Sequence, residues 1–194
     1  MKFGSVPAAD IMQYSNRVEM KSIIVTLMLA FCPAIALAAP PQNVTAKSLG
    51  MEIQAIGPAR VLEKYYDTPA WVNSITPGIE GGGSQWLAIA QELHSGADGA
   101  AAEDIDLALY FGALPREPFR VIPLLNTIYG GTVEKICTIG FEAEIPKGGV
   151  ANYLAAIKTK LKAANTKAEN AMASACLRGL EQTRIEAEAQ GIKE

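Results

Sequence analysis

The sequence predicts an all-α protein, in which an irregular array or bundle of short helices is closed by one long C-terminal amphipathic helix. Apolar residues recur at three- and four-residue steps through most of residues 58–145, which is the helical spacing. Glycine and proline interrupt this pattern at short intervals. Residues 151–190 contain eleven alanines and no proline, a composition typical of a long helix.

The overall composition excludes several classes of protein. The chain has 194 residues and is 49% hydrophobic, with a formal net charge of −3. The apolar share is too high for a disordered chain, and the charge gives no electrostatic basis for binding nucleic acid. His94 is the one histidine, and no residues have metal-ligand spacing. We therefore expect no metal, no cofactor and no nucleic-acid partner.

Residues 1–38 are interpreted as an upstream extension followed by a signal peptide that is removed. An apolar run at 23–39 follows Lys21 and ends in Ala36-Leu37-Ala38, the pattern of a secretory signal cleaved after Ala38. The run has about seventeen residues and contains Pro33, so it is marginal for a membrane span. We expect a periplasmic or secreted protein that does not contact the membrane after cleavage.

The mature chain is predicted to comprise a leader, 39–57, and a single helical domain, 58–194. Within the leader, Val44–Ile56 fits either a helix or a short strand. Pro58 suits the first turn of a helix that runs through Tyr66.

A second short helix is expected from Pro69, with Thr68 as its cap. Thr76-Pro77-Gly78 is predicted to end this helix, and Glu80-Gly81-Gly82-Gly83 reads as a turn.

Three further helices are predicted before the C-terminal segment. Ser84 is expected to cap a helix that closes at Gly96. Residues 100–114 are apolar nearly all round, so this helix should lie at the centre of the core. Residues 121–128 fit another helix, which contains Pro123.

The C-terminal segment is interpreted as one long helix or as two in line. Ala168, Ala171 and Ala175 belong to a predicted seam of small residues along it. The net charge of 39–145 is −7, whereas that of 146–194 is +3. The basic helix is therefore expected to dock on the acidic body.

Two cysteines survive the predicted cleavage, Cys137 and Cys176. In an oxidising compartment such a pair favours one disulfide. Cys137 should point inward, because it continues the helical spacing of Val133 and Ile136. The alternative is a pair of buried free thiols.

A binding surface is predicted near the glycine-rich turn. Aromatic side chains are common anchors at interfaces, and three of them lie close to this turn in the sequence. An arginine–glutamate pair between two prolines is a second rigid, exposed candidate. The predicted binding residues are Tyr65, Tyr66, Trp71, Glu80, Arg116 and Glu117.

The sequence gives little support for a catalytic site. A Ser84–His94–Asp98 triad fails because ten residues of helix separate the serine from the histidine by about 15 Å. Glu103 and Asp106 belong to the densest acidic cluster, but acidic residues in the first turns of a helix favour its dipole anyway.

These observations lead to one expected function and two alternatives. We expect an exported, non-enzymatic helical protein that binds another macromolecule in the cell envelope, with an inhibitor or immunity-type partner of an envelope enzyme as one version. One alternative is a small hydrolase of cell-wall or sugar substrates that uses Glu80, Glu103 or Asp106. The other is a helical scaffold that binds a small ligand near Trp71.

Overall fold

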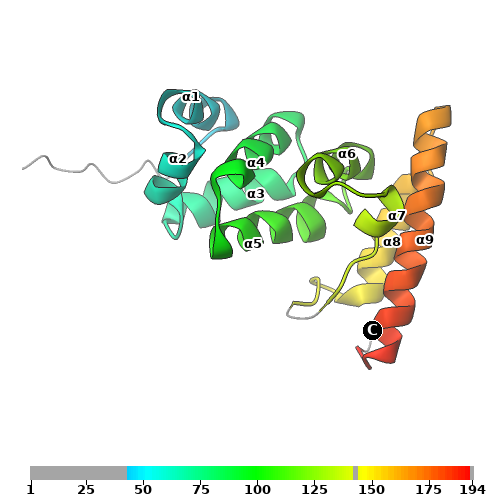
Figure 1. Ribbon diagram of the computed structural model, residues 1–194. Coiled ribbons are helices and arrows are strands. Elements are labelled where there is room, and N and C mark those ends of the chain that lie inside the picture. The colour runs from blue at the N-terminus through cyan, green and yellow to red at the C-terminus, as the bar shows by residue number, and fades with distance from the viewer. Residues whose placement is uncertain (1–42, 142–143, 193–194) are drawn as a thin grey trace, which may run out of the picture. The chain divides into compact units, whose positions relative to one another are not determined.

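A computed structural model describes residues 43–141 and 144–192, and within these residues the protein is all-α, as predicted (Figure 1). The predicted signal peptide and residues 39–42 lie outside the described residues. The helices belong to the compact unit Ala38–Glu194. In chain order they are α1 (Ala46–Ile56), α2 (Pro58–Tyr65), η1 (Trp71–Ile75), α3 (Thr76–Glu80), α4 (Ser84–Gly96), α5 (Gly99–Leu107), η2 (Ala108–Ala113), α6 (Pro118–Tyr129), α7 (Val133–Ile136), α8 (Gly149–Leu161) and α9 (Lys167–Ala189).

The ambiguous segment 44–56 is helical. Thr45 and Ser48 form a reciprocal capping box at the start of α1, each side-chain oxygen accepting from the other's backbone N–H at 3.1 Å. Leu49 and Ile53 are buried within the same core as the later helices. The helical body therefore begins at Ala46, earlier than the start at Pro58 that the sequence predicts.

The helix that begins at Pro69 is predicted to end at Thr76-Pro77-Gly78. This prediction is wrong, because the helix continues to Glu80. The reason is the π-helix η1, in which the Thr76 N–H donates to the Trp71 carbonyl five residues back. In a regular α-helix the Pro77 ring would clash with the carbonyl four residues earlier, and the wider π turn avoids this. Gly78 lies under the Trp86 indole, since a Cβ atom there would be 2.3 Å from the ring.

The predicted central helix is confirmed as the continuous pair α5–η2. Ile105, Leu109 and Leu114 are fully buried. The second half of the pair is again a π-helix, because the Leu114 N–H donates to the Leu109 carbonyl at 2.8 Å. As in η1, a proline (here Pro115) stands two residues beyond the π-helix.

The starts of α4 and α6 differ from the predicted positions. Gly83, not Ser84, occupies the cap position of α4, and Ser84 is the first helical residue. Helix α6 begins earlier than predicted, at Pro118, and runs through Pro123 to Tyr129.

The C-terminal segment contains the predicted long helix as α9. The segment as a whole is a hairpin of α8 and α9, whereas the sequence predicts one helix or two in line. The start of α8 and the end of α9 lie side by side, because Val150, Leu154 and Ala187 line one small hollow. The break comes where Thr166 caps α9 through a capping box with Glu169. Within the described residues no helix is both long and apolar enough to cross a membrane.

The buried face of α9 differs from the predicted seam. Ala168 and Ala171 are exposed, because the helix turns a different stripe toward the core. That stripe follows three- and four-residue steps and consists of Ala173, Cys176, Leu180, Thr183 and Ala187.

A disulfide joins Cys137, at the end of α7, to Cys176 in α9, with a Cα–Cα distance of 5.1 Å. Both cysteines are fully buried, so the predicted pairing and the inward direction of Cys137 are confirmed. Close approach of the two helices requires Gly179, where a Cβ atom would lie 2.2 Å from the Glu134 carbonyl oxygen. We call this contact region of α7, residues 137–139 and α9 the α7–α9 joint.

Candidate binding groove

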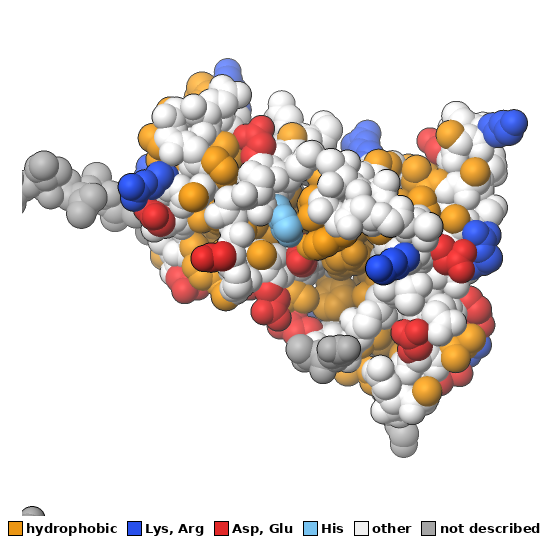
Figure 2. Space-filling view, in the orientation of Figure 1, with side chains coloured by type: hydrophobic (Ala, Val, Ile, Leu, Met, Phe, Trp, Pro, Cys, Tyr) orange, Lys and Arg blue, Asp and Glu red, His pale blue; other side chains and the backbone are white. Residues whose placement is uncertain are grey.

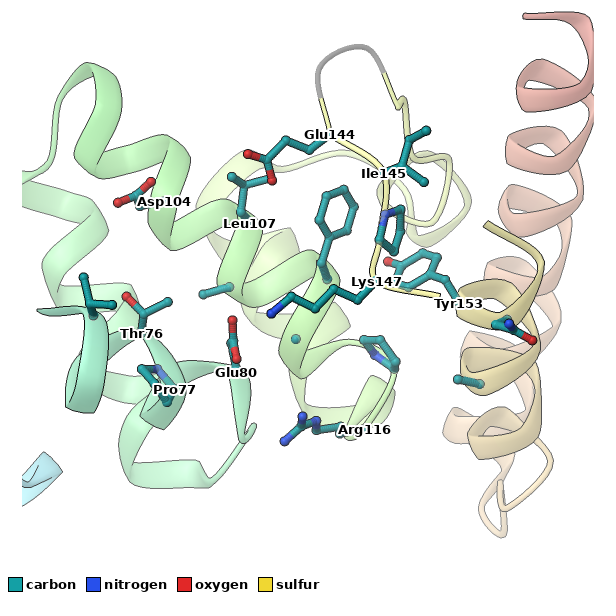
Figure 3. Close-up of a pocket in the computed structure, with 18 of the residues that line it drawn as sticks. Thr76, Pro77, Glu80, Asp104, Leu107, Arg116, Glu144, Ile145, Lys147 and Tyr153 are labelled. Atoms are coloured by element: carbon teal, nitrogen blue, oxygen red, sulfur yellow. The ribbon is translucent and has the colours of Figure 1, made fainter. Parts of the chain in front are cut away.

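The described residues form an open groove of about 960 Å³. Figure 2 shows hydrophobic side chains lining a hollow between α5 and the α7–α8 segment. The close-up in Figure 3 shows η1 and α3 on one side of the groove, α8 on the other, and η2 between them. The groove is lined by Trp71, Val72, Thr76, Pro77, Glu80, Asp104, Leu107, Ala108, Phe111, Gly112, Pro115, Arg116, Glu144, Ile145, Pro146, Lys147, Asn152, Tyr153 and Ala156.

Both π-helices of the described chain contribute to this groove. Trp71 and Val72 come from η1, whereas Phe111 and Gly112 come from η2. Helices of this type are rare and occur frequently at functional sites. Their meeting in one groove marks it as the candidate site independently of the residues that the sequence singled out.

The floor of the groove is held by Tyr153. In the π pattern the Tyr110 carbonyl would accept from residue 115, but Pro115 has no N–H. The Tyr153 hydroxyl donates to this carbonyl instead, at 2.8 Å. Burial raises the pKa of the Tyr153 hydroxyl, so it remains a neutral donor.

Aromatic packing fixes the same floor from a second direction. The rings of Phe111 and Tyr153 meet edge to face, with centroids 5.7 Å apart. Phe141 contacts both rings, at 6.1 Å each. Such aromatic pairs contribute about 0.5–1.5 kcal/mol beyond their buried area, so the base of the groove is a rigid surface.

Gly112 and Glu80 form the central contact of the groove. A Cβ atom at Gly112 would lie 2.4 Å from the Glu80 Cγ atom, so only glycine lets Glu80 lie against η2. From the opposite side Lys147 extends across the groove toward Glu80 (Figure 3). The two opposite charges therefore face each other across its middle.

Trp71 is oriented by Asp104. The indole Nε1–H of Trp71 donates to the Asp104 carboxylate at 3.1 Å. The Tyr66 ring meets the Trp71 ring edge to face at 5.3 Å. Desolvation and the nearby Asp104 carboxylate raise the pKa of the Tyr66 hydroxyl. Asp104 is thus already engaged by the Trp71 indole.

The structure brings together three of the six predicted binding residues. Trp71, Glu80 and Arg116 line the groove, and Tyr66 supports Trp71 from outside the lining. Tyr65 lies elsewhere: it is buried and donates to Glu52 at 2.8 Å.

Glu117 also lies outside the lining. It is 3.9 Å from Arg120 and packs against the Gly82 turn, where a Cβ atom would be 3.0 Å from the Glu117 Cγ atom. Its contacts therefore connect that turn to the start of α6.

The predicted binding residues include none from the segment 144–147. Glu144, Ile145 and Lys147 are exposed and line the groove. No local signal marks this segment in the sequence, because a single apolar residue in a loop is common.

His94 belongs to a separate cluster on α4, α5 and α6. Its Nε2 atom lies 3.1 Å from the Tyr129 hydroxyl and 3.4 Å from the Asp106 carboxylate. Burial and the hydrogen bond to Asp106 raise the pKa of the Tyr129 hydroxyl. Burial and Asp106 together raise the pKa of Tyr110 to about 12. None of His94, Asp106 and Tyr129 lines the groove.

The described residues contain no group of three or more histidine, cysteine, aspartate or glutamate side chains placed to hold a metal ion. Comparisons of the chain with protein families, with curated proteins and with solved structures find no match.

Proposed function

We propose that the protein is an exported binding protein, and that its groove takes a segment of a partner protein in the cell envelope without catalysing a reaction. The observation that carries this proposal is the groove itself, which combines a rigid aromatic floor with an apolar rim. Val72 is 63% exposed and Ile145 is 55% exposed, and both belong to the lining.

The exposed rim favours a protein partner. Large apolar side chains left in water next to a concave site are typical of interaction surfaces. Val72 belongs to η1 and Ile145 to the segment that leads into α8, so a segment lying along the groove would bury both. A ligand enclosed by the groove alone would leave much of this rim exposed.

The hydrolase alternative receives less support from the placement of its carboxylates. Glu80 lines the groove, Asp106 contacts His94 instead, and Glu103 is exposed outside the lining. Paired carboxylates must flank one scissile bond to hydrolyse a glycoside.

An inhibitor or immunity-type protein for an envelope enzyme is the version of binding that fits export together with the groove.

The export part of the proposal is supported by the disulfide, because such bonds persist in oxidising compartments. Its test is the intact mass and N-terminal sequence of the protein recovered from the native host. We expect a chain that begins at Ala39 and weighs two hydrogens less than its reduced form. A cytoplasmic chain that retains residues 20–38 and has Cys137 and Cys176 as free thiols would contradict export.

The binding part is tested with a displayed library of random twelve-residue peptides, selected on the purified protein. Enriched peptides are then titrated against a rim variant, Val72→Glu/Ile145→Glu, and against a matched control, Leu177→Glu/Ile185→Glu. The control residues are also exposed apolar side chains, 41% and 47% exposed, but lie on α9. We expect the rim variant to lose binding and the control to keep it, and the reverse result would overturn the proposal.

Binding of a small ligand near Trp71 is the second candidate, since about 960 Å³ lies within the range of small-molecule sites. The same rim variant separates the two functions. A compound seated beside Trp71 and Phe111 would bind the Val72→Glu/Ile145→Glu variant almost as well as the wild type, whereas a peptide would not.

A further inference from the structure

The groove has opposite charge at its two ends. Glu144 and Asp104 lie toward one end, and Arg116 lies toward the other (Figure 3). Between them Lys147 extends toward Glu80, so the middle carries one charge of each sign. A ligand that lies along the groove therefore meets a negative end, a balanced middle and a positive end.

Arg116 stands apart from the other arginines of the described chain. Arg60, Arg120, Arg178 and Arg184 each form an ion pair with a glutamate. Arg116 is exposed and forms no ion pair with any described residue. Its guanidinium presents five N–H donors in a planar fork that matches a carboxylate.

Glu144 is the available acid at the opposite end. Asp104 already accepts from Trp71, whereas Glu144 is exposed and forms no ion pair with a described residue. Arg116 and Glu144 are therefore the cation and the anion at opposite ends of the groove, outside the facing pair Lys147 and Glu80. Leu107 and Phe111 offer an apolar surface between them.

We infer that the segment bound in the groove is zwitterionic, with an acidic group at Arg116, a basic group at Glu144 and an apolar side chain between them. This inference rests on the proposed function and adds the chemistry of its ligand. Charge complementarity of this kind selects partners and sets their direction more than it raises affinity. The preference is expected to weaken at high salt, because both groups are exposed.

The test uses three peptide libraries with blocked termini that differ only in two fixed residues. Four random positions separate a lysine and a glutamate, two glutamates, or two lysines. On the wild-type protein we expect the mixed library to bind about fivefold to tenfold more tightly than either like-charged library at low salt, an effect of rim charges of opposite sign.

Charge reversal of the groove then predicts a change of ranking. Arg116→Glu should make the two-lysine library the best binder, and Glu144→Lys should do so for the two-glutamate library. The double variant Arg116→Glu/Glu144→Lys, with both ends reversed, should again prefer the mixed library. The matched controls Lys47→Glu and Glu92→Lys, exposed and outside the lining, should keep the wild-type ranking.

The outcomes separate this inference from the function on which it rests. Binding that depends on the rim but not on the fixed charges of the peptide would overturn the inference of a zwitterionic ligand. Equal changes of ranking in the control variants would do the same. Either result would leave the groove as a binding site. Failure of all three libraries to bind would overturn both.

Discussion

The α7–α9 joint and the groove differ in whether their polar side chains have partners. At the joint the buried Thr183 hydroxyl accepts from the Ile139 N–H at 2.7 Å and lies 3.2 Å from the Cys137 carbonyl oxygen. Arg178 pairs with Glu134 on the surface of the same joint. In the groove Arg116 and Glu144 face open space instead.

This difference separates the contacts that stabilise the fold from the groove in which we propose that a partner binds. Buried polar groups that find partners hold a unique packing, and a covalent bond reinforces it at the joint. Charged and apolar side chains left unpaired at a concave surface add little to stability but are free to meet a ligand. Changes at the joint should therefore lower stability and spare binding, and changes in the groove should do the opposite.

The largest expected effect is the loss of the disulfide. Replacing both cysteines, Cys137→Ser/Cys176→Ser, should lower the free energy of unfolding by about 4 kcal/mol, because the bridge closes a loop of 39 residues in the unfolded chain. Urea unfolding of the oxidised wild type and the double variant measures the difference. An unchanged midpoint would show that the joint does not depend on its covalent bond.

Gly179→Ala should come next. Its new Cβ atom would meet the Glu134 carbonyl at 2.2 Å and the Cys137 carbonyl carbon at 2.8 Å. Overpacking against backbone should lower stability by about 3 kcal/mol, as measured by chemical denaturation. Gly140→Ala is the matched control, since nothing lies within 4 Å of a Cβ atom there. Equal effects of the two substitutions would contradict close helix contact at Gly179.

Thr183→Val should lower the free energy of unfolding by about 2 kcal/mol, because it leaves the buried Ile139 N–H without its acceptor. Thr183→Ser keeps the hydroxyl and should lose less. Thermal and urea unfolding of both variants test the difference. If the Thr183→Val variant were as stable as the Thr183→Ser variant, the hydroxyl would have no role in the joint.

Tyr153→Phe lies at the boundary between the two regions. Removing the hydroxyl leaves the Tyr110 carbonyl without its donor, and the expected loss of stability is about 1 kcal/mol. Because the ring remains, the groove should keep its floor and its peptide affinity should fall less than twofold. A large loss of affinity with unchanged stability would show that the hydroxyl itself contacts the ligand.

The smallest effect on stability is expected from the groove charges. Arg116→Glu and Glu144→Lys should each change the free energy of unfolding by less than about 0.5 kcal/mol, because both side chains are exposed. The same urea titrations measure this. A loss comparable to that of Gly179→Ala would remove the distinction between the two regions.

Much of the fold follows from local patterns in the sequence. The all-α class, the central helix 100–114 and the long final helix rest on apolar spacing and composition. The pairing of Cys137 with Cys176 rests on the two cysteines that survive the predicted cleavage and on the expected oxidising compartment. Among the candidate binding residues, Trp71, Glu80 and Arg116 do line one groove. Their common feature in the sequence is proximity to glycine or proline.

The remaining features depend on contacts that spacing does not encode. The helix passes through Pro77 because η1 widens the preceding turn and Gly78 packs under Trp86. Both conditions are tertiary.

The hairpin turn did have a local signal. Thr166 and Glu169 form the capping-box pattern, but the alanine-rich spacing on either side continues the helical pattern across it. The loop 144–147 joins the site only because α8 folds back toward η2, where Tyr153 reaches the Tyr110 carbonyl.

The most direct test of the groove is a chemical-shift titration with the best peptide of the mixed library. The protein has two tryptophans, and Trp86→Phe identifies the indole signal of Trp71. Binding in the groove predicts peptide-dependent shifts of the Trp71 indole and the Gly112 amide, with no change along the outer face of α9 at Leu177 and Ile185. Shifts at Leu177 and Ile185 without any at Trp71 would contradict it.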